Sequence, residues 1–353
     1  MKKLFALLLA VMVLAVSVAG CGSRDITLET TDGVTETQGS TDPVEKDTEA
    51  EVTVDTQFVL EYPADMQALG FTETLVMEKA PERIVCLSTS PVLALHELGA
   101  NIIGVPISTV VVWPEDLVNN TESVTFSVMG ENYDFEAVLA LEPDLVMLAS
   151  AARDTAGAAL ESLGVTVYYV YAGHTVSYES VKMQTEVLID AFDMTEESIA
   201  AGQAIMARFA ALEARLEETK ARYEGKRVLV LQSNTATSHY AQTEKGTLGS
   251  MVDMIGFANV YENEGASLAQ VDMEQMLSYD PDYIICVGSG SAEYQESLMQ
   301  QAYESNPDYW NAIDAVANGN VICLDVSYIS SAGINVIDKI VGLMDIIEAA
   351  IGA

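Results

Sequence analysis

Short apolar runs recur along most of the chain, separated by segments whose apolar residues repeat at helical spacing. Runs of this kind, placed between helical segments, predict strands that are buried on both faces of a parallel sheet. We therefore predict an α/β fold of alternating strands and helices. The predicted strands are 84–87, 102–105, 145–148, 165–170, 228–232, 283–287 and 321–325.

One unit of sequence occurs twice. Segments 133–147 and 271–285 align without gaps, and each contains an Asp suited to capping a helix, a Glu in the first helical turn, a short helix, an acidic residue before Pro-Asp, and an apolar strand. Arg83 and Arg227 each lead into a predicted strand. The repetition predicts two Rossmann-like lobes of similar construction, each with a parallel sheet.

A long helix is predicted between the two lobes. Residues 196–223 are rich in Ala, Leu, Met, Glu and Arg, and Ile205, Phe209, Leu212 and Leu216 recur at helical spacing. At 1.5 Å per residue this helix is about 40 Å long. We expect it to connect the lobes once, as a stiff strut that allows only small hinge motion. The single Gly202 is tolerable in such a helix.

The N-terminus has the pattern of a secretory signal. Lys2 and Lys3 precede an apolar run that ends in small residues before Cys21. The quartet Val-Ala-Gly-Cys resembles a bacterial lipoprotein box, which implies a lipid on Cys21; an ordinary signal peptide with an incidental Cys is the alternative. The predicted division is a signal peptide (1–20), a lipidated Cys with a disordered acidic tether (21–57), a first lobe (58–194), a bridging helix (195–224) and a second lobe (225–353).

Charge narrows the possible partners. The chain has 16 Lys and Arg against 53 Asp and Glu, a net charge of −37, which excludes nucleic acid and docking onto anionic lipid through a basic patch. Half of its residues are apolar, so it can still form cores. Cys86, Cys286 and Cys323 lie in strand-like apolar runs and are predicted to be small buried residues rather than a disulfide framework or a metal site.

Several motifs together resemble one family. They are Pro-Glu-Arg-Ile-Val at 81–85 with the Ser-rich turn and Leu-Gly-Ala that follow, the twin Glu-helix-Pro-Asp-strand units, and the segment 310–321. From about residue 58 to the end, the chain is similar to periplasmic-binding-protein family 2, the receptors of ABC importers for siderophores, haem and cobalamin. The resemblance implies two lobes bridged by one helix, little closure on binding, no enzymatic activity and a monomer.

The same resemblance implies a membrane partner. One surface Glu per lobe docks onto Arg residues of the permease dimer, which works with its ATPase; here these would be Glu136 and Glu274. The alternative is that both are favourable first-turn helix charges and nothing more. With a lipid on Cys21, the receptor would sit on the extracytoplasmic face of the cell membrane.

The ligand is predicted from the loops after the strands, which form the crevice in parallel sheets. The chain looks most like the haem-binding lipoproteins of Gram-positive bacteria, in which a first-lobe Met and a second-lobe His bind the iron. Met129 lies near the Met position, and Ser289 occupies the His position. The candidate ligand-binding residues are Ser88, Thr89, Ser108, Trp113, Met129, Arg153, Tyr171, His174, His239, Tyr240, Ser289 and Tyr328.

These candidates are mostly neutral. His174 and His239 are expected in cleft loops and His96 inside a helix, and three dispersed His do not favour a free zinc or manganese site. Arg153 is the single Arg expected near the crevice, with Lys245 as the nearest second-lobe cation. A ferric catecholate would need several cations, so haem, a neutral or cationic hydroxamate chelate, or a corrinoid is favoured.

We therefore predict a lipid-anchored receptor with no intrinsic cofactor that captures an iron chelate, with haem slightly ahead of a siderophore. A cobalamin receptor of the same family is the alternative. A secreted two-lobed α/β enzyme is the alternative from another class, but Gly-Ser-Gly-Ser at 288–291 is only a fragment of a phosphate loop and no Gly-x-Ser-x-Gly motif occurs.

Overall fold

Two α/β lobes and the helices between them make up the computed structural model. It describes residues 57–108, 111–124, 133–171, 177–263, 265–330 and 333–351, which belong to one unit of the chain. The predicted signal, Cys21 and tether lie outside the described residues, as do the ligand candidates Met129 and His174. Among the helices that are described, none has both the length and the apolar character needed to cross a membrane.

The first lobe contains a parallel sheet with the strand order β5-β4-β3-β6-β7. Its central strand β3 is buried on both faces: Ile84 and Cys86 pack into one apolar cluster, and Val85 packs into another. This double burial explains why the strand reads as a continuous apolar run. The strands are β3 (Ile84–Cys86), β4 (Ile102–Pro106), β5 (Glu122–Val124), β6 (Leu145–Ala149) and β7 (Val167–Val170).

Helices and one small sheet surround this first sheet. The antiparallel strands β1 and β2 flank α1, and Tyr62, which follows β1, stacks on Tyr168 of β7 at 4.6 Å between ring centroids. The elements are β1 (Phe58–Leu60), α1 (Ala64–Ala68), β2 (Leu75–Met77), α2 (Val92–Glu97), α3 (Glu115–Asn120), α4 (Phe135–Ala140), the 3-10 helix η1 (Ser150–Ala152), the π-helix η2 (Arg153–Gly157) and α5 (Ala158–Ser162).

The second lobe departs from the predicted parallel sheet. Its order is β11-β9-β8-β12-β13, with β10 beside β8, and both β9 and β11 run antiparallel to their neighbours. The strands are β8 (Arg227–Thr235), β9 (Ser238–Gln242), β10 (Ala258–Asn259), β11 (Leu268–Gln270), β12 (Tyr283–Val287) and β13 (Val321–Cys323). The sheet is therefore mixed, because the segment expected to be a cleft loop after β8 turns back as a hairpin strand.

The helices of the second lobe follow the strands in order. They are α8 (Thr247–Ile255), α9 (Met273–Tyr279), α10 (Ala292–Ser305), α11 (Pro307–Trp310), α12 (Asp314–Ala317), the 3-10 helices η3 (Val326–Ile329) and η4 (Gly333–Asn335), and α13 (Val336–Ile351). The α8 helix ends at Gly256, whose φ of 115° is the left-handed conformation that a helix C-terminus favours.

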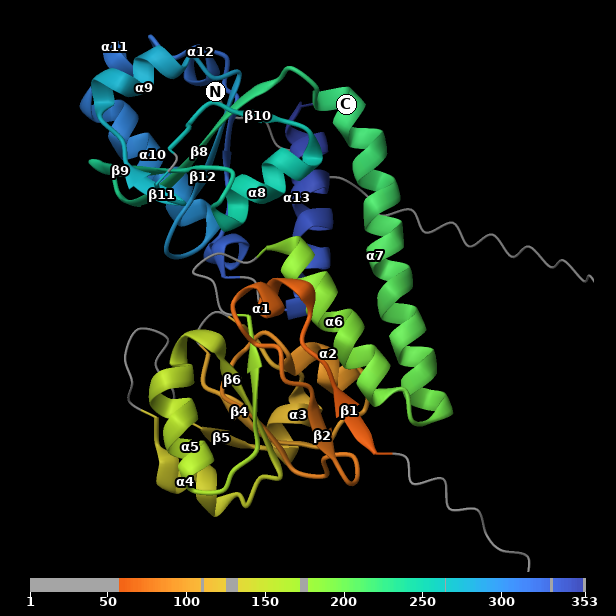
Figure 1. Ribbon diagram of the computed structural model, residues 1–353. Coiled ribbons are helices and arrows are strands. Elements are labelled where there is room, and N and C mark those ends of the chain that lie inside the picture. Colours follow the sequence, from red (N-terminus) through yellow and green to blue (C-terminus); the bar gives the residue numbers. More distant parts are fainter. Residues whose placement is uncertain are drawn as a thin grey trace, which may run out of the picture. The chain divides into compact units, whose positions relative to one another are not determined.

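The predicted long helix is present as α7 (Glu196–Tyr223), which follows α6 (Tyr178–Phe192) and extends alongside both lobes (Figure 1). Thr195 and Ser198 cap its start reciprocally, each side chain accepting a hydrogen bond from the other's backbone N–H. The predicted apolar face, represented by Ile205 and Phe209, is buried in the main core. The helix therefore forms for the reasons that its sequence suggests.

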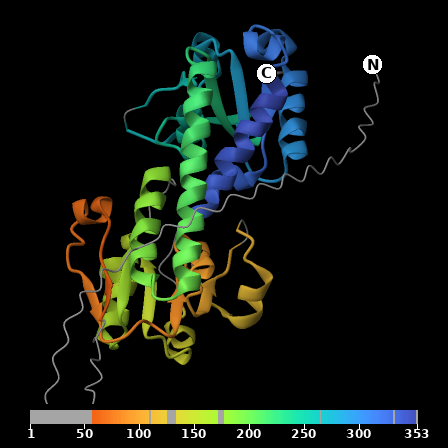
Figure 2. The same ribbon diagram turned by 90° about the vertical axis from the view of Figure 1, so that its right-hand side faces the viewer.

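A second connection between the lobes was not predicted. Helix α13 lies beside α7 (Figure 2), and η4 at its start contacts α2 and α6 of the first lobe. One apolar cluster runs from first-lobe Leu95 through Phe209 of α7 to Ile340 of α13 and Val230 of β8. The two lobes therefore share a continuous core, in addition to the covalent strut.

Arginines at seven-residue intervals strengthen the outer side of this connection. Arg208 of α7 pairs with Glu97 of α2 at 2.9 Å and with Asp338 of α13 at 3.3 Å. Arg215 and Arg222 pair with α13 carboxylates, which include Asp345 and Glu348. These three arginines are therefore occupied within the fold.

The sequence repeat is also a structural repeat. Asp134 caps α4 by accepting from the N–H of Ala137, and Asp272 caps α9 by accepting from the N–H of Glu274. After each helix one acidic residue takes the left-handed conformation, with φ of 47° at Glu142 and 43° at Asp280. Because few residues other than Gly adopt this conformation, its occurrence at matching positions confirms that the two segments are equivalent.

Candidate functional site

Six of the predicted ligand residues gather at one edge of the first-lobe sheet. All five strands of that sheet run parallel, so their carboxyl ends lie along the same edge. The six are Ser88 and Thr89 after β3, Ser108 and Trp113 after β4, Arg153 after β6, and Tyr171 after β7. The sheet topology therefore places these polar and aromatic side chains in neighbouring loops.

The loop after β4 is held by its own hydrogen bonds. The indole Nε1 of Trp113 donates to the carbonyl of Pro106 at 3.0 Å, and the hydroxyl of Ser108 accepts from the N–H of Val111 at 2.9 Å. Trp113 is half-buried against the main core, which leaves part of its ring exposed. Trp113 thus combines a fixed position with an accessible aromatic surface.

Arg153 is the cation of the first-lobe edge. Its guanidinium lies 4.6 Å from the centre of the Phe71 ring, a cation–π contact, and the residue is exposed. Arg153 begins the single turn of π-helix η2, a local irregularity of the kind that often occurs at functional sites. Burial raises the pKa of nearby Tyr62, and the charge of Arg153 opposes that rise.

The loops after β12 and β13 form the corresponding edge of the second lobe. Ser289 is exposed, and its carbonyl accepts a hydrogen bond of 2.7 Å from Nε2 of the buried Gln295. The N–H of Val326 donates to the carbonyl of Gly290 at 2.9 Å, which joins the two loops. Ser289 therefore has a fixed backbone and an accessible hydroxyl, as a ligand contact requires.

Sequence reasoning missed Lys339, the cation of this second edge. Its ammonium lies 5.0 Å from the centre of the Tyr328 ring and donates to the hydroxyl of Ser327. Burial alone would raise the pKa of nearby Asp325, but hydrogen bonds from Ser327 and the charge of Lys339 lower it overall. The sequence contained one signal, since Lys339 is the single basic residue after position 320.

Tyr328 and Lys245 are placed differently from what the sequence suggested. Tyr328 is only 7% exposed, because it packs in the main core beneath Lys339. Lys245 follows β9, which runs antiparallel to β8, so it lies away from the edge where β8 ends. The cation of the second-lobe edge is therefore Lys339 instead of Lys245.

His239 is an internal residue of the second lobe. It lies in β9 rather than in a loop, is 3% exposed, and packs edge-on against Trp310 at 5.6 Å between ring centroids. Its Nδ1 shares a hydrogen bond of 2.7 Å with the hydroxyl of Ser233. Burial lowers the pKa of His239, so the neutral ring is favoured. In this arrangement the imidazole does not face a ligand.

Tyr240 follows in the same strand and points to the other side of the sheet. It is half-buried, and its strand partners are Gln232 of β8 and Gln270 of β11. Its aromatic surface therefore belongs to the sheet face and not to a cleft loop as predicted.

The proposed docking residues occupy equivalent surface positions. Glu136 lies in the first turn of α4 and Glu274 in the first turn of α9, and both are exposed. Each helix leads into a parallel strand, β6 or β12, and so begins near the carboxyl edge of its sheet. Neither carboxylate forms an ion pair with another described residue. Both remain available to an external basic partner.

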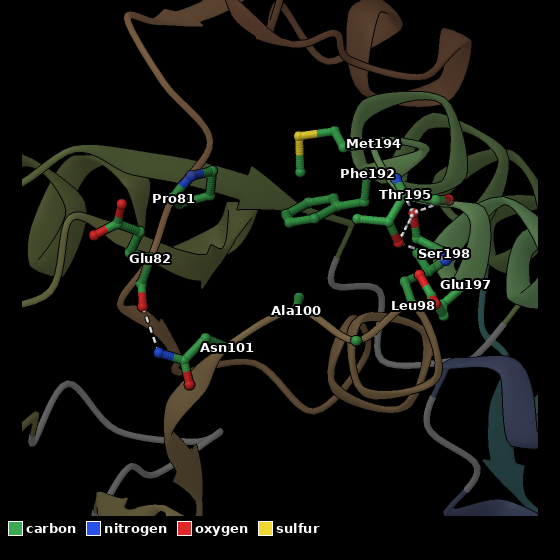
Figure 3. Close-up of a pocket in the computed structure, with 11 residues that line it drawn as sticks. Pro81, Glu82, Leu98, Ala100, Asn101, Phe192, Met194, Thr195, Glu197 and Ser198 are labelled. Carbon is green, nitrogen blue, oxygen red and sulfur yellow. Dashed lines mark hydrogen bonds between the residues drawn. The ribbon is translucent and has the colours of Figure 1, made fainter.

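A hollow of about 400 Å³ lies elsewhere, at the amino edge of the first-lobe sheet (Figure 3). Its walls come from the residues before β3 and β4 and from the junction of α6 with α7, including Phe192, Met194 and Thr195. The amide of Asn101 donates to the carbonyl of Glu82 at 2.5 Å on one side. This hollow is at the opposite edge from the candidate ligand residues, so it does not mark their site.

Among the described residues no three His, Cys, Asp or Glu side chains are grouped so that they could hold a metal ion. Within the described part of the chain, the two edges instead present hydroxyl and aromatic side chains with one cation each, Arg153 and Lys339. Such a surface can bind a largely apolar ligand that carries a small number of anionic groups.

Comparison with known proteins agrees with this architecture. A protein of the high-affinity heme uptake system of Staphylococcus aureus (strain MRSA252), IsdE, is 21% identical over 243 residues, which cover 69% of this chain and 79% of that protein. The iron uptake ABC transporter substrate-binding protein PiuA from Streptococcus pneumoniae has a similar structure, with a TM-score of 0.63 at 20% identity, covering 84% of this chain and 99% of that one.

The petrobactin-binding protein YclQ from Bacillus subtilis is similar in the same way, with a TM-score of 0.62 at 22% identity over 84% of this chain and 99% of that one. The sequence pattern of the periplasmic binding proteins matches residues 84–328, which include strands of both lobes and all of α7. The predicted family and bridged two-lobe fold are therefore confirmed. The chain belongs to the periplasmic binding protein family, a family of non-enzymatic ABC substrate-binding proteins.

Proposed function

We propose that this protein captures an iron chelate outside the cell, with haem slightly favoured over a siderophore, and delivers it to an ABC permease. The observation that carries the proposal is one cation at each sheet edge, Arg153 and Lys339, together with the partly exposed rings of Trp113 and Tyr171 in the first-lobe loops. Haem is flat and apolar and carries two carboxylates, so it needs aromatic surface and two cations.

The distribution of the other arginines supports the same choice. Arg83 and Arg227 hydrogen-bond backbone carbonyls, and Arg208, Arg215 and Arg222 pair with carboxylates along α7. None of these five is at a ligand edge. A ferric catecholate, which carries several negative charges, would lack the cations that its burial needs. The names of two relatives, a heme uptake protein and an iron uptake protein, agree with an iron-containing ligand.

Binding to haem iron would involve Met129 as the first-lobe ligand. Ser289 stands where the second-lobe His is expected, and an exposed hydroxyl is a poor ligand for haem iron compared with His, Met, Cys or Tyr. We therefore propose a single protein ligand, Met129, in the haem complex. Met129→Ala should then change the absorption spectrum of the bound haem, and an unchanged spectrum would remove this residue from the site.

A ligand panel tests the proposal directly. The purified protein is titrated with hemin, a ferric hydroxamate, a ferric catecholate and cobalamin, and binding is followed by absorbance and calorimetry. We expect hemin to shift its Soret band at one equivalent. A stoichiometric complex with the hydroxamate or cobalamin and none with hemin would instead assign one of those ligands. Absence of binding to all four would refute the proposed function.

Variants of the two cations sharpen this test. Arg153→Gln and Lys339→Gln each remove one positive charge beside an aromatic ring, and each is expected to weaken hemin binding about 10-fold or more. Lys79→Gln removes a fully exposed cation that pairs with Glu82 before β3, at the amino edge, and serves as the matched control. Equal affinities for all three variants would show that neither cation faces the ligand.

We further propose that a lipid on Cys21 anchors the protein at the extracytoplasmic face of the membrane. The support is the small-residue signal that ends at this cysteine and the acidic segment that follows it. Cells that express the full chain should incorporate a labelled fatty acid into it, and Cys21→Ala should release the protein into the medium. Labelling of the Cys21→Ala variant would show that the anchor lies elsewhere.

A further inference from the structure

Two free thiols are paired on neighbouring strands of the second lobe. Cys286 in β12 and Cys323 in β13 are direct partners in the parallel ladder. Both pack into the apolar cluster that contains Trp310, whereas the adjacent Ile285 and Ile322 pack on the opposite face of the sheet. The two cysteine side chains therefore project from the same face of the sheet and lie beside each other.

The spacing of the two strands brings the side chains close to bonding distance. Neighbouring strands are about 4.8 Å apart, and side chains of paired residues stand side by side above the sheet. A disulfide prefers Cβ atoms about 3.8 Å apart. Closing the bond between Cys286 and Cys323 would thus require the strands to approach by about 1 Å, and the resulting strain favours a disulfide that is easily reduced.

We propose that Cys286 and Cys323 form a reversible disulfide that fastens edge strand β13 to β12 in an oxidising exterior. The proposal rests on the proposed location outside the cell, but it depends neither on the identity of the ligand nor on the importer. It departs from the prediction that the cysteines are small buried residues rather than a disulfide framework. Cys86 does match that prediction, because it is fully buried and its strand partner in β6 is Met147. Cys86 therefore has no thiol opposite it.

Access favours Cys323 as the first thiol to react. Strand β13 is at the end of the sheet order, and Cys323 is partly exposed, whereas Cys286 is fully buried in the adjacent inner strand. A reagent can approach the edge strand without opening the core. The buried thiol is then in position to attack the sulfur of the modified one.

The acid strengths of the two thiols support this order. A hydrogen bond that the Cys286 thiol donates to Cys323, together with burial, raises the pKa of Cys286. The same hydrogen bond stabilises the Cys323 thiolate and lowers the pKa of Cys323, although partial burial opposes the change. Because the thiolate is the reactive form, Cys323 is the nucleophile.

The oxidant is a small disulfide. The Cys323 thiolate attacks one of its sulfurs, the S–S bond of the reagent breaks, and the first thiolate leaves. Cys286 then loses its proton and attacks the Cys323 sulfur, which releases the second thiolate. The two released thiolates take up the two thiol protons, so the protein loses two electrons and two protons and the reagent gains them.

The bond would act on the candidate ligand edge. The loop that follows β12 contains Ser289, the loop that follows β13 contains Tyr328, and the hydrogen bond from Val326 to Gly290 joins them. Fastening β13 to β12 holds the strands from which both loops depart. We expect the oxidised protein to melt several degrees higher than the reduced protein, because the bond restrains the unfolded chain.

Differential alkylation of the full chain tests the pair. The folded protein is incubated with oxidised glutathione, free thiols are blocked, the chain is unfolded and digested, and peptides are identified by mass. We expect the peptides of Cys286 and Cys323 to be recovered as one linked species that reductant separates, while Cys86 remains a free thiol. Recovery of Cys286 and Cys323 as free thiols, at a glutathione ratio that oxidises a typical surface dithiol, would overturn the proposal.

Two variants separate the roles of the thiols and guard against misfolding. Cys286→Ala should leave a stable glutathione adduct on Cys323, and Cys323→Ser should abolish both the adduct and the linked peptide. Each variant is first shown to unfold in a single thermal transition, with the native chain measured alongside it. An adduct on Cys286 in the Cys323→Ser variant would contradict the proposed order, and a link that includes Cys86 would overturn the pair itself.

Discussion

Arg83 and Arg227 hold the same position in the two lobes and make the same contact. The guanidinium of Arg83 donates to the carbonyls of Leu141 and Glu142 at the end of α4, and that of Arg227 donates to the carbonyl of Tyr279 at the end of α9. Each arginine therefore satisfies carbonyls that the helix leaves without a partner and places a positive charge at the negative end of the helix.

The first prediction concerns these two arginines. Arg83→Ala and Arg227→Ala should each lower the free energy of unfolding by roughly 1 to 2 kcal/mol, because helix-end carbonyls lose charged donors. Chemical denaturation measures the change. Lys79→Ala, which removes an exposed pair with Glu82, should leave the free energy of unfolding nearly unchanged. Similar losses for all three variants would show that the contacts to the helix ends contribute no more stability than an exposed ion pair.

The second prediction concerns Gly202, where α7 crosses α6. A Cβ atom at this position would lie 2.7 Å from Cγ2 of Ile189, closer than carbon atoms can approach. Gly202→Ala should therefore destabilise the protein by about 1 kcal/mol, although Ala is the better helix former. The double variant Gly202→Ala with Ile189→Ala should lose less stability than the sum of the losses in the two single variants. Strict additivity in this cycle would exclude the clash.

The third prediction follows from the buried His239. Because burial lowers the pKa of this ring in the folded protein, the unfolded chain binds a proton at a higher pH than the folded chain does. The stability that the neutral ring provides is complete above about pH 6.5, the pKa of the unfolded chain, and falls as the pH decreases towards the folded pKa. Denaturation at several pH values from 7 to 5 measures the loss.

His239→Gln should flatten this pH dependence, because the amide carries no charge at either end of the pH range. A loss of stability on acidification that is as steep in His239→Gln as in the native protein would show that another group is responsible.

The fourth prediction concerns docking to the permease. Glu136→Gln together with Glu274→Gln should abolish ligand-dependent stimulation of the reconstituted transporter ATPase while ligand affinity stays unchanged, because both charges are exposed and unpaired within the described chain. Glu115→Gln with Glu293→Gln is the matched control, since these residues are also exposed first-turn glutamates. Normal stimulation by the first pair would refute the docking role.

The strand pattern was predictable because its cause is local. Parallel strands covered on both faces must be apolar along their length, so runs such as 145–148 and 283–287 are visible in the sequence and appear as β6 and β12. The repeat was predictable for a similar reason, since capping residues such as Asp134 and Asp272 act within their own helices.

The hairpin of β8 and β9 was not predictable in the same way. Its turn at Ala236 and Thr237 contains neither Gly nor Asn, the usual signals for a tight hairpin. The location of His239 and Tyr240 depends on that turn, so both were expected in a cleft loop although both lie in a strand. Likewise, the pairing of Cys286 with Cys323 depends on strand register, which tertiary packing determines.

Gly202 shows how a single residue can be explained only by its neighbour. In the sequence it is a small cost within a long helix. In the structure it is the point at which Ile189 of α6 fits against the α7 backbone. Lys339 is a comparable case, because its importance depends on the Tyr328 ring beneath it.

The first-lobe core cannot be completed until α13 has packed against it. This last helix packs against α7, and η4 at its start contacts α2 and α6, so residues 333–351 complete a core that the first lobe begins. In chain order α13 follows every other described element, so the first lobe is made before the helix that completes its core. The first lobe keeps an apolar face uncovered until α13 packs against it. Loss of the C-terminal helix would consequently leave both lobes unfinished, including the one encoded farthest from it.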